Sequence, residues 1–386
     1  MIKLTNFMRK ILIFIIGIVG ILALAWLIYY IVGRATAPKT ASPETKSPEQ
    51  AVEEINGEPV ATTTGQLKII SKESVFDYWI ASSTQEIFYV TEAGKIAEIN
   101  PDGQDTLLSE QQIGDLNFIL SSPDSRKIIV AFGNQAQPQF SIFDLTNNSW
   151  TPLPLEIKSA AWSPEGKRIA VITSQNNQTN LTIIDVAKYF STDAKQKEKA
   201  SKIIIKNFAL KDLKIDWLMP DELVFTDKPS SLAMGSAWRF NLSKLNFDEI
   251  VPPGNGLMIK WLKDDLGLKF QNQKSSLINW AGQAINDFPF MALPDKCVLK
   301  IDSLYCFLFT PASPKTKWPD DYLQKSTFTN DSLYKFNLGN LTAPELVFEN
   351  TIEGKIIDAS NLKLLGNQIL FTNRYDSLLY GLEISN

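Results

Sequence analysis

Few side chains in this sequence of 386 residues are suited to catalysis, and no histidine is among them. Histidine is the usual proton-transfer residue near neutral pH and the commonest zinc and copper ligand. Its absence excludes Ser-His-Asp, Cys-His and histidine-ligated zinc sites, while carboxylate, tyrosine or lysine chemistry stays open. Neither a phosphate-binding glycine loop nor a G-x-S-x-G elbow is present. We therefore expect no catalytic residue, no cofactor and no metal site, and binding is favoured over catalysis.

The two cysteines, Cys297 and Cys306, end the segment CVLKIDSLYC. If Ile301-Asp302 is the two-residue loop of a hairpin, Lys300 pairs with Ser303 and Cys297 lies opposite Cys306. The pair then occupies a non-hydrogen-bonded position, where the Cα separation of about 4.5 Å is at the short end of disulfide geometry. We expect a disulfide and a domain that faces an oxidising compartment, with two buried thiols as the alternative.

Two pairs of adjacent carboxylates, Asp264-Asp265 and Asp320-Asp321, could contribute oxygen ligands to a divalent metal. A calcium or magnesium site needs further oxygen ligands at defined spacing, and no calcium-loop pattern is present. We interpret both pairs as solvated turn residues.

An apolar segment of 22 residues runs from Ile11 to Val32 without a charge or a proline. At 1.5 Å per residue it spans about 33 Å, which is enough to cross the hydrocarbon core of a bilayer. A cleaved signal peptide is the alternative, because Ala35-Thr36-Ala37 has the small-x-small pattern of a cleavage site. The length of the apolar run and the position of Pro38 disfavour cleavage. The sequence predicts an uncleaved transmembrane helix whose partner is the lipid bilayer.

The predicted helix divides the chain into unequal parts. Residues 1–10 carry a slight excess of positive charge and are expected to be cytoplasmic, which places the bulk of the chain on the extracytoplasmic side. Residues 33–65 are rich in proline, threonine, serine and glutamate and predict a disordered linker. Residues 66–386 form the folded domain.

The folded domain consists of short apolar runs separated by turn residues, which is typical of antiparallel strands. The runs group into repeated four-strand units, spaced about 40 to 60 residues apart as in propeller blades. The units begin near Phe76, Leu116, Lys158, Leu213, Leu257, Cys297 and Ile356. The sequence predicts an all-β fold, a β-propeller of seven four-stranded blades, with six or eight blades as alternatives.

One phrase recurs in these units. Asn117 to Val130 reads NFILSSPDSRKIIV, and Ser159 to Val171 reads SAAWSPEGKRIAV at matching offset. Proline, an acidic residue and glycine suit a tight turn, so the phrase predicts a hairpin between the first two strands of a blade. Fainter copies contain Trp217 and Trp261 at the place of Trp162, and we expect these rings to pack between blades.

The segment from Trp162 to Ala170, WSPEGKRIA, resembles the WD40-like repeat of the TolB family of propellers. It is also similar to repeats in the propeller domains of prolyl oligopeptidase-type peptidases. The resemblance implies a propeller and an envelope protein that binds other proteins. The peptidases' Ser-His-Asp triad does not carry over, because the sequence has no histidine and no room for a hydrolase domain.

Ring closure is predicted from the two ends of the domain. The last unit is expected to supply strands near Gly354–Ala359, Gln368–Thr372 and Leu378–Ile384. Leu67–Ser71 is expected to add the missing outer strand, which would remove an open sheet edge.

Two loop regions contain candidate partner-binding residues. The connection from residue 311 to residue 330 contains Trp318, Tyr322 and Phe328, and a shorter loop leads to Trp238 and Arg239. Exposed aromatic side chains can anchor a protein partner. The alternative is an insertion that folds over its own blade.

Two functional hypotheses follow. The first is a membrane-anchored interaction module that binds a protein or polymer of the cell envelope. The second is a carbohydrate- or peptide-acting enzyme or lectin-like domain that uses carboxylates in the central channel, and convergent Asp, Glu or Arg side chains in one deep pocket would favour it. A purely structural role is a third possibility. Nucleic acid is not an expected partner, because the net charge is −4.

Overall fold

The computed structural model describes residues 67–384, except 82, 101–102, 155, 176–177, 209–211, 264, 311–312, 314 and 351–355. The predicted cytoplasmic residues 1–10, the helix Ile11–Val32 and the linker 33–65 lie outside the described residues. Among the helices of the described part, none is long and apolar enough to cross a membrane.

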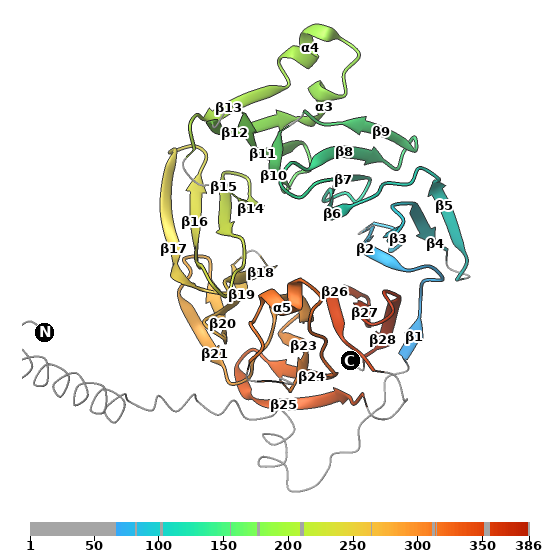
Figure 1. Cartoon of the computed structure of the whole chain (residues 1–386), viewed down its shortest axis with the longest axis vertical. Coiled ribbons are helices and arrows are strands. Elements are labelled where there is room, and N and C mark those ends of the chain that lie inside the picture. Colours follow the sequence, from blue (N-terminus) through green and yellow to red (C-terminus); the bar gives the residue numbers. More distant parts are fainter. Residues whose placement is uncertain are drawn as a thin grey trace, which may run out of the picture. The chain divides into compact units, whose positions relative to one another are not determined.

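Seven four-stranded antiparallel sheets form the blades of a closed ring (Figure 1). The prediction of a seven-bladed all-β propeller is confirmed. The seven innermost strands are β2 (Val75–Ile80), β6 (Leu116–Ser121), β10 (Ile157–Trp162), β14 (Leu213–Met219), β18 (Met258–Lys263), β22 (Cys297–Lys300) and β26 (Ala359–Leu365). The second strands are β3 (Ile87–Thr91), β7 (Lys127–Phe132), β11 (Arg168–Gln175), β15 (Glu222–Asp227), β19 (Leu266–Gln271), β23 (Ser303–Phe309) and β27 (Gln368–Asn373).

The outer half of each blade is more exposed. The third strands are β4 (Ile96–Ile99), β8 (Gln139–Asp144), β12 (Gln178–Asp185), β16 (Met234–Asn241), β20 (Lys274–Asn279), β24 (Asp331–Asn337) and β28 (Leu379–Glu383). The outermost strands are β5 (Asp105–Ser109), β9 (Ser149–Pro152), β13 (Ser201–Ile205), β17 (Asn246–Asn255), β21 (Ala284–Phe288), β25 (Asn340–Phe348) and β1 (Leu67–Ile69).

Helices occur only as short pieces in the connections of the described part. They are α3 (Val186–Tyr189) and α4 (Ala194–Glu198) between β12 and β13, the 3₁₀ turn η1 (Pro294–Lys296) before β22, and α5 (Asp320–Leu323) between β23 and β24. The last two lie beside the channel and matter for the site.

The second strands are buried on both faces, because each blade packs between two neighbours. In β7, Ile129 and Ala131 belong to the core shared with the third blade, whereas Ile128 and Val130 belong to the core shared with the first. None of these four side chains is exposed. Successive side chains of a strand point to opposite faces, and both faces of β7 are buried. Its sequence is therefore a continuous apolar run. Each fully buried valine or isoleucine side chain contributes about 1.5–3 kcal/mol to folding.

The repeated phrase forms the hairpin between the first and second strands, as predicted. In the second blade Ser125 has φ of 59°, and in the third blade Gly166 takes the same place with φ of 68°. The rings of Trp162 and Trp217 are 7% and 5% exposed and pack between blades, and the half-buried Trp261 also packs against a core shared by two blades.

The ring closes through β1, which pairs with β28 as the outermost strand of the last blade. This closure agrees with the prediction. The predicted strand near Gly354–Ala359 is wrong, because the innermost strand of that blade is β26 and starts at Ala359. The apolar residues that follow Ala359 supply the strand, and a bulge between Ser360 and Lys363 gives Asn361 a φ of 54°.

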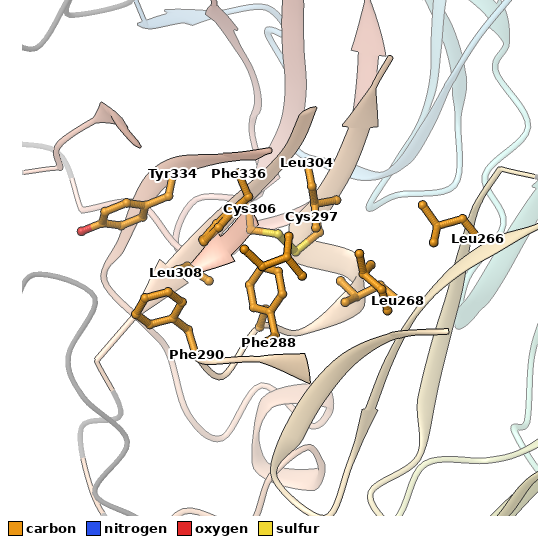
Figure 2. Packing of buried hydrophobic residues seen from close by; sticks show 13 residues of the cluster. Leu266, Leu268, Phe288, Phe290, Cys297, Leu304, Cys306, Leu308, Tyr334 and Phe336 are labelled. Atoms are coloured by element: carbon orange, nitrogen blue, oxygen red, sulfur yellow. A yellow bond between two sulfur atoms is a disulfide. The ribbon is translucent and has the colours of Figure 1, made fainter. Parts of the chain in front are cut away.

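Cys297 and Cys306 are directly opposite in the β22–β23 hairpin and are joined by a disulfide with a Cα separation of 4.2 Å. Lys300 pairs with Ser303, as predicted. Both sulfurs are buried between the fifth and sixth blades, among Leu268, Phe288 and Phe336 (Figure 2).

Candidate functional site

The central channel opens into one cavity at each end of the ring. Antiparallel strands alternate in direction, so the loops that enter the innermost strands and the loops that join second to third strands share one end. The cavity at that end has a volume of about 620 Å³, and we call it the channel mouth. The cavity at the other end measures about 580 Å³ and is lined by Trp79, Trp162 and Trp217. Charged side chains gather mainly on the first of these two cavities, whereas Asp216 and Lys363 are the charged residues that line the second.

Lys260 of β18 reaches across the channel mouth to two other blades. Its Nζ donates hydrogen bonds to Cys297 O at 2.8 Å and to Leu362 O at 3.1 Å. Burial lowers the pKa of Lys260 to about 8, and the charge of Asp295 opposes that change. The ammonium is still mostly charged at neutral pH, and one of its three N–H donors is not used by these two bonds.

Asp295 and Tyr322 form the part of the mouth contributed by the sixth blade. Tyr322 donates its hydroxyl hydrogen to Asp295 Oδ2 at 2.7 Å, and burial raises the pKa of Tyr322 well above its usual value. Among the described residues, neither Asp295 Oδ1 nor Thr226 Oγ1 has a hydrogen-bond partner, and both atoms are buried. Both residues line the cavity. A ligand that donates hydrogen bonds would satisfy both atoms.

Asp77 of β2 lines the mouth from the first blade. Its Oδ1 accepts hydrogen bonds from Tyr78 N at 2.7 Å and from the side-chain amide of Asn361, and Lys363 Nζ lies 3.8 Å away. Burial raises the pKa of Asp77, and the charge of Lys363 lowers it by less. The positive φ of Asn361 turns its amide toward Asp77, so the bulge in β26 serves the mouth.

The connection between β23 and β24, which we call the insertion (residues 310–330), covers part of the mouth. Asp320 accepts hydrogen bonds from Ser231 N at 2.8 Å and Ser231 Oγ at 2.7 Å, which joins the insertion to the fourth blade. Arg374 of the seventh blade donates to Tyr322 O at 2.5 Å, and its guanidinium lies 3.9 Å from the Tyr322 ring centre. Figure 1 shows α5 of the insertion beside the centre of the ring. The insertion is thus held by contacts with other blades.

The insertion also fits closely against the fifth blade. Gly256 has φ of 70°, and a Cβ atom at this position would lie 2.8 Å from Pro319 Cδ. A larger residue at position 256 would therefore push the insertion away from the mouth.

A buried charge cluster lies next to the insertion and contacts it through Thr329. Lys296 Nζ donates to Asp331 Oδ2 at 2.5 Å, to Asp358 Oδ1 at 2.7 Å and to Thr329 Oγ1 at 3.1 Å. Arg374 Nη1 donates to Asp358 Oδ2 at 2.6 Å. Two cations therefore neutralise two carboxylates in the interior, as buried charges require.

The edge of the mouth carries exposed apolar side chains. Leu232 is 80% exposed, Met234 is 72% exposed and Leu323 is 46% exposed. The loop of Leu232 is bonded to the insertion that carries Leu323, through Ser231 and Asp320. We call these three residues the apolar rim.

The candidate partner-binding aromatics fall into two groups. The expectation that Trp318 and Tyr322 are exposed is wrong: they are 6% and 3% exposed, because Trp318 packs on Phe309 and Tyr322 lies under Arg374. Phe328 is 37% exposed and stacks on Tyr375. The alternative, that the insertion folds over its own blade, describes Trp318, which packs on Phe309 of β23, whereas Tyr322 also contacts Arg374 of the seventh blade.

Trp238 and Arg239 lie in β16 and are not among the residues that line the channel mouth. Trp238 is half-buried against the core of the fourth blade, and Arg239 forms an ion pair of 3.3 Å with Asp248. The structure does not bring them to the channel mouth. Their role as partner contacts stays a prediction.

Adjacent carboxylates of the two Asp-Asp pairs have different surroundings in the structure. Asp320 binds Ser231, and Asp321 Oδ2 accepts from Lys317 N at 2.8 Å. Asp264 lies outside the described residues, and its neighbour Asp265 lines a surface hollow with Arg239. Among the described residues no cluster of three or more potential ligands could hold a metal ion.

Sequence reasoning missed Lys260, Asp295 and Thr226. The partners of Lys260 are main-chain carbonyls 37 and 102 positions away in the sequence, so no local pattern marks it. Asp295 stands in an ordinary Pro-Asp turn. Lysine in the middle of an otherwise apolar inner strand was the one signal available.

No family model and no curated protein matches the sequence. The structure is similar to virginiamycin B lyase from Staphylococcus aureus, solved with quinupristin, with a TM-score of 0.52 and 15% identity over 83% of this chain and 99% of that one. It is similar to the C-terminal WD40 domain of Sif2, with a TM-score of 0.51 and 12% identity over 84% of this chain and 99% of that one.

A third similar structure is a prolyl endopeptidase, with a TM-score of 0.52 and 13% identity over 82% of this chain. The match spans 51% of the endopeptidase chain. Similarity at these identities shows the fold alone, and enzymes and a WD40 domain occur together among the neighbours. The chain is thus a seven-bladed β-propeller of four-stranded blades with WD40-like structural neighbours.

Proposed function

We propose that this protein is a membrane-anchored binding module whose propeller receives an envelope protein at the channel mouth. The anchor is the apolar segment Ile11–Val32, the linker 33–65 gives reach, and residues 1–10 remain in the cytoplasm. Support for an oxidising, extracytoplasmic location comes from the Cys297–Cys306 bridge in the β22–β23 hairpin. The TolB-like phrase around Trp162 points to the same class of envelope protein.

The observation that carries the proposal is the apolar rim beside a cavity with unsatisfied polar groups. Three exposed apolar side chains at one site are characteristic of interaction surfaces, whereas single ones are ordinary. Within the cavity, Asp295 Oδ1 and Thr226 Oγ1 have no hydrogen-bond partner among the described residues. The rim is held by the contacts of the insertion with neighbouring blades, so little conformational entropy would be lost on binding.

Site-specific photo-crosslinking in native membranes tests this function. A photo-reactive residue replaces Leu232 or Leu323 in the full chain, and the matched control replaces Ile301, which is 82% exposed in a hairpin turn at the opposite end of the ring. We expect one discrete crosslinked product from both rim positions and none from Ile301. Equal products from all three positions, or a product from Ile301 alone, would contradict the proposal.

The anchor is tested separately. Alkaline carbonate extraction should leave the full chain in the membrane pellet, and a chain that starts at Leu67 should be released. Recovery of the full chain in the supernatant would show that Ile11–Val32 does not span the bilayer.

A second candidate is a carbohydrate- or peptide-acting enzyme or lectin-like domain. Asp77, Asp295 and Arg374 line one cavity, which is the convergence that we expected to favour this function. A carboxyl with a raised pKa, as for Asp77, can act as a general acid. Turnover of oligosaccharide or peptide libraries that is lost in Asp77→Asn but retained in Asp302→Asn would favour this candidate over simple binding.

A further inference from the structure

The charged groups of the channel mouth are not evenly paired. Three of its cations have carboxylate partners: Lys214 with Asp216 at 3.0 Å, Lys325 with Glu92 at 3.8 Å and Arg374 with Asp358 at 2.6 Å. The fourth, Lys260, is held by two carbonyl oxygens. The cations of the mouth are thus largely engaged by the protein itself.

Two carboxylates of the mouth lack such partners. Among the described residues, no lysine or arginine nitrogen lies within 4.0 Å of Asp227 or Asp295. Asp227 Oδ2 accepts from Ser236 N at 2.9 Å, and Asp295 Oδ2 accepts from Tyr322. Against these two negative charges stands the single charge of Lys260, so the unpaired groups sum to about one negative charge. A cationic ligand group is therefore favoured.

An independent observation comes from the neighbour of Asp227. Thr226 is 4% exposed and lines the cavity, and its Oγ1 has no hydrogen-bond partner within the part of the chain that the structure describes. A buried hydroxyl without a partner is costly in the absence of a ligand. Together with Asp295 Oδ1, it provides two acceptors for N–H donors from a ligand.

We propose that the mouth binds a lysine or arginine side chain of a partner polypeptide, between Asp227, Asp295 and Thr226. The inference rests on the proposed function, in which the mouth receives a polypeptide. Apolar residues such as Leu257 and Met258 line the cavity and suit the methylene stem of such a side chain. The apolar rim contacts the residues that flank the basic one.

Lys260 has a defined part in this arrangement. Its carbonyl bonds hold the ammonium in place, and its third N–H can donate to a main-chain carbonyl of the bound segment. A polypeptide offers such a carbonyl beside every basic residue. A free amine or an amino sugar lacks both the carbonyl and the apolar neighbours.

The test uses the full chain in detergent micelles and three dye-labelled peptides. They are acetyl-Ala-Leu-Xaa-Leu-Ala-amide with lysine, norleucine or glutamate at the central position. Fluorescence anisotropy should show the lysine peptide binding at least ten-fold more tightly than the norleucine peptide, and the glutamate peptide most weakly. Equal affinity of the lysine and norleucine peptides, tighter binding of glucosamine, or no binding of any peptide would overturn the inference.

Variants locate the effect. Asp295→Asn and Asp227→Asn should each lower the affinity for the lysine peptide by about five- to ten-fold and leave the affinity for the norleucine peptide unchanged. Thr226→Val, which keeps the shape of the side chain, should lower the affinity for the lysine peptide by about two- to three-fold. The matched control Asp302→Asn lies in the hairpin turn at the opposite end of the ring and should change neither. An equal loss in Asp302→Asn would contradict the site.

The two proposals fail in different ways. If the rim crosslinks to a partner and Asp295→Asn leaves that product unchanged, the binding function stands and the basic-residue inference falls. If the lysine peptide is preferred but no rim crosslink forms in membranes, the chemistry of the mouth stands and the envelope partner falls.

Discussion

Lys296 Nζ and Asp331 Oδ2 lie 2.5 Å apart, and neither side chain is exposed to solvent. Asp358, equally buried, accepts from the same ammonium and from Arg374. This cluster ties the start of the sixth blade to the seventh and supports the insertion over the mouth. The cluster places charged groups in the protein interior next to the channel mouth.

Replacing Lys296 by methionine should strongly destabilise the propeller. The change leaves Asp331 and Asp358 buried with one cation between them, which costs about 3–5 kcal/mol in comparable cases. Urea unfolding followed by tryptophan fluorescence measures the loss. Lys68→Met is the control, because Lys68 and Glu383 form an exposed pair and should contribute less than about 1 kcal/mol. Equal losses in the two variants would contradict the role of the cluster.

The stability of the protein should depend on the titration of Asp331. Burial raises the pKa of Asp331 to about 6, and the charge of Lys296 only partly offsets this effect. Between about pH 4 and 6 the folded state then holds a proton that the unfolded state has lost, so this residue's contribution to stability falls as pH rises. The difference in unfolding free energy between the wild type and Asp331→Asn should change across this window. A constant difference from pH 4 to 7 would show an ordinary carboxyl.

Loss of the disulfide should lower stability without changing the fold. Cys297 and Cys306 close a loop of about ten residues, for which the chain-entropy account gives about 2–3 kcal/mol. The double variant Cys297→Ser, Cys306→Ser should unfold at lower urea and should not respond to reductant, whereas the wild type should. Two free thiols in alkylated, unreduced protein from native membranes would remove the claim of a bridge.

Removal of the closing strand should expose a sheet edge. β1 covers β28, and Ile70 N donates to Leu379 O at 2.8 Å. A chain that begins at Ser71 should be less stable and should self-associate, because the edge of β28 is then unpaired. The matched control begins at Leu67 and keeps β1. Light scattering and thermal melting compare the two, and identical behaviour would show that β1 is dispensable.

The local features of this protein could be predicted from its residues alone. Turn residues in the phrase around Pro123 and Pro164 predict hairpins, and the spacing of such units predicts seven blades, because turn chemistry and period-two alternation act over a few residues. The hairpin register of Cys297 and Cys306 follows from the length of one loop. The strand assigned to Gly354–Ala359 was wrong, because an apolar run alone does not define where a strand starts.

The contacts between polar groups, in contrast, depend on how the blades assemble. Lys260 finds carbonyls in the sixth and seventh blades, and Lys296 reaches Asp358 across 62 positions. The burial of Tyr322 likewise depends on Arg374, which belongs to another blade. Such partners are set by closure of the ring, which brings together residues that no short-range pattern relates. The channel mouth is therefore a property of the assembled blades and not of any one of them.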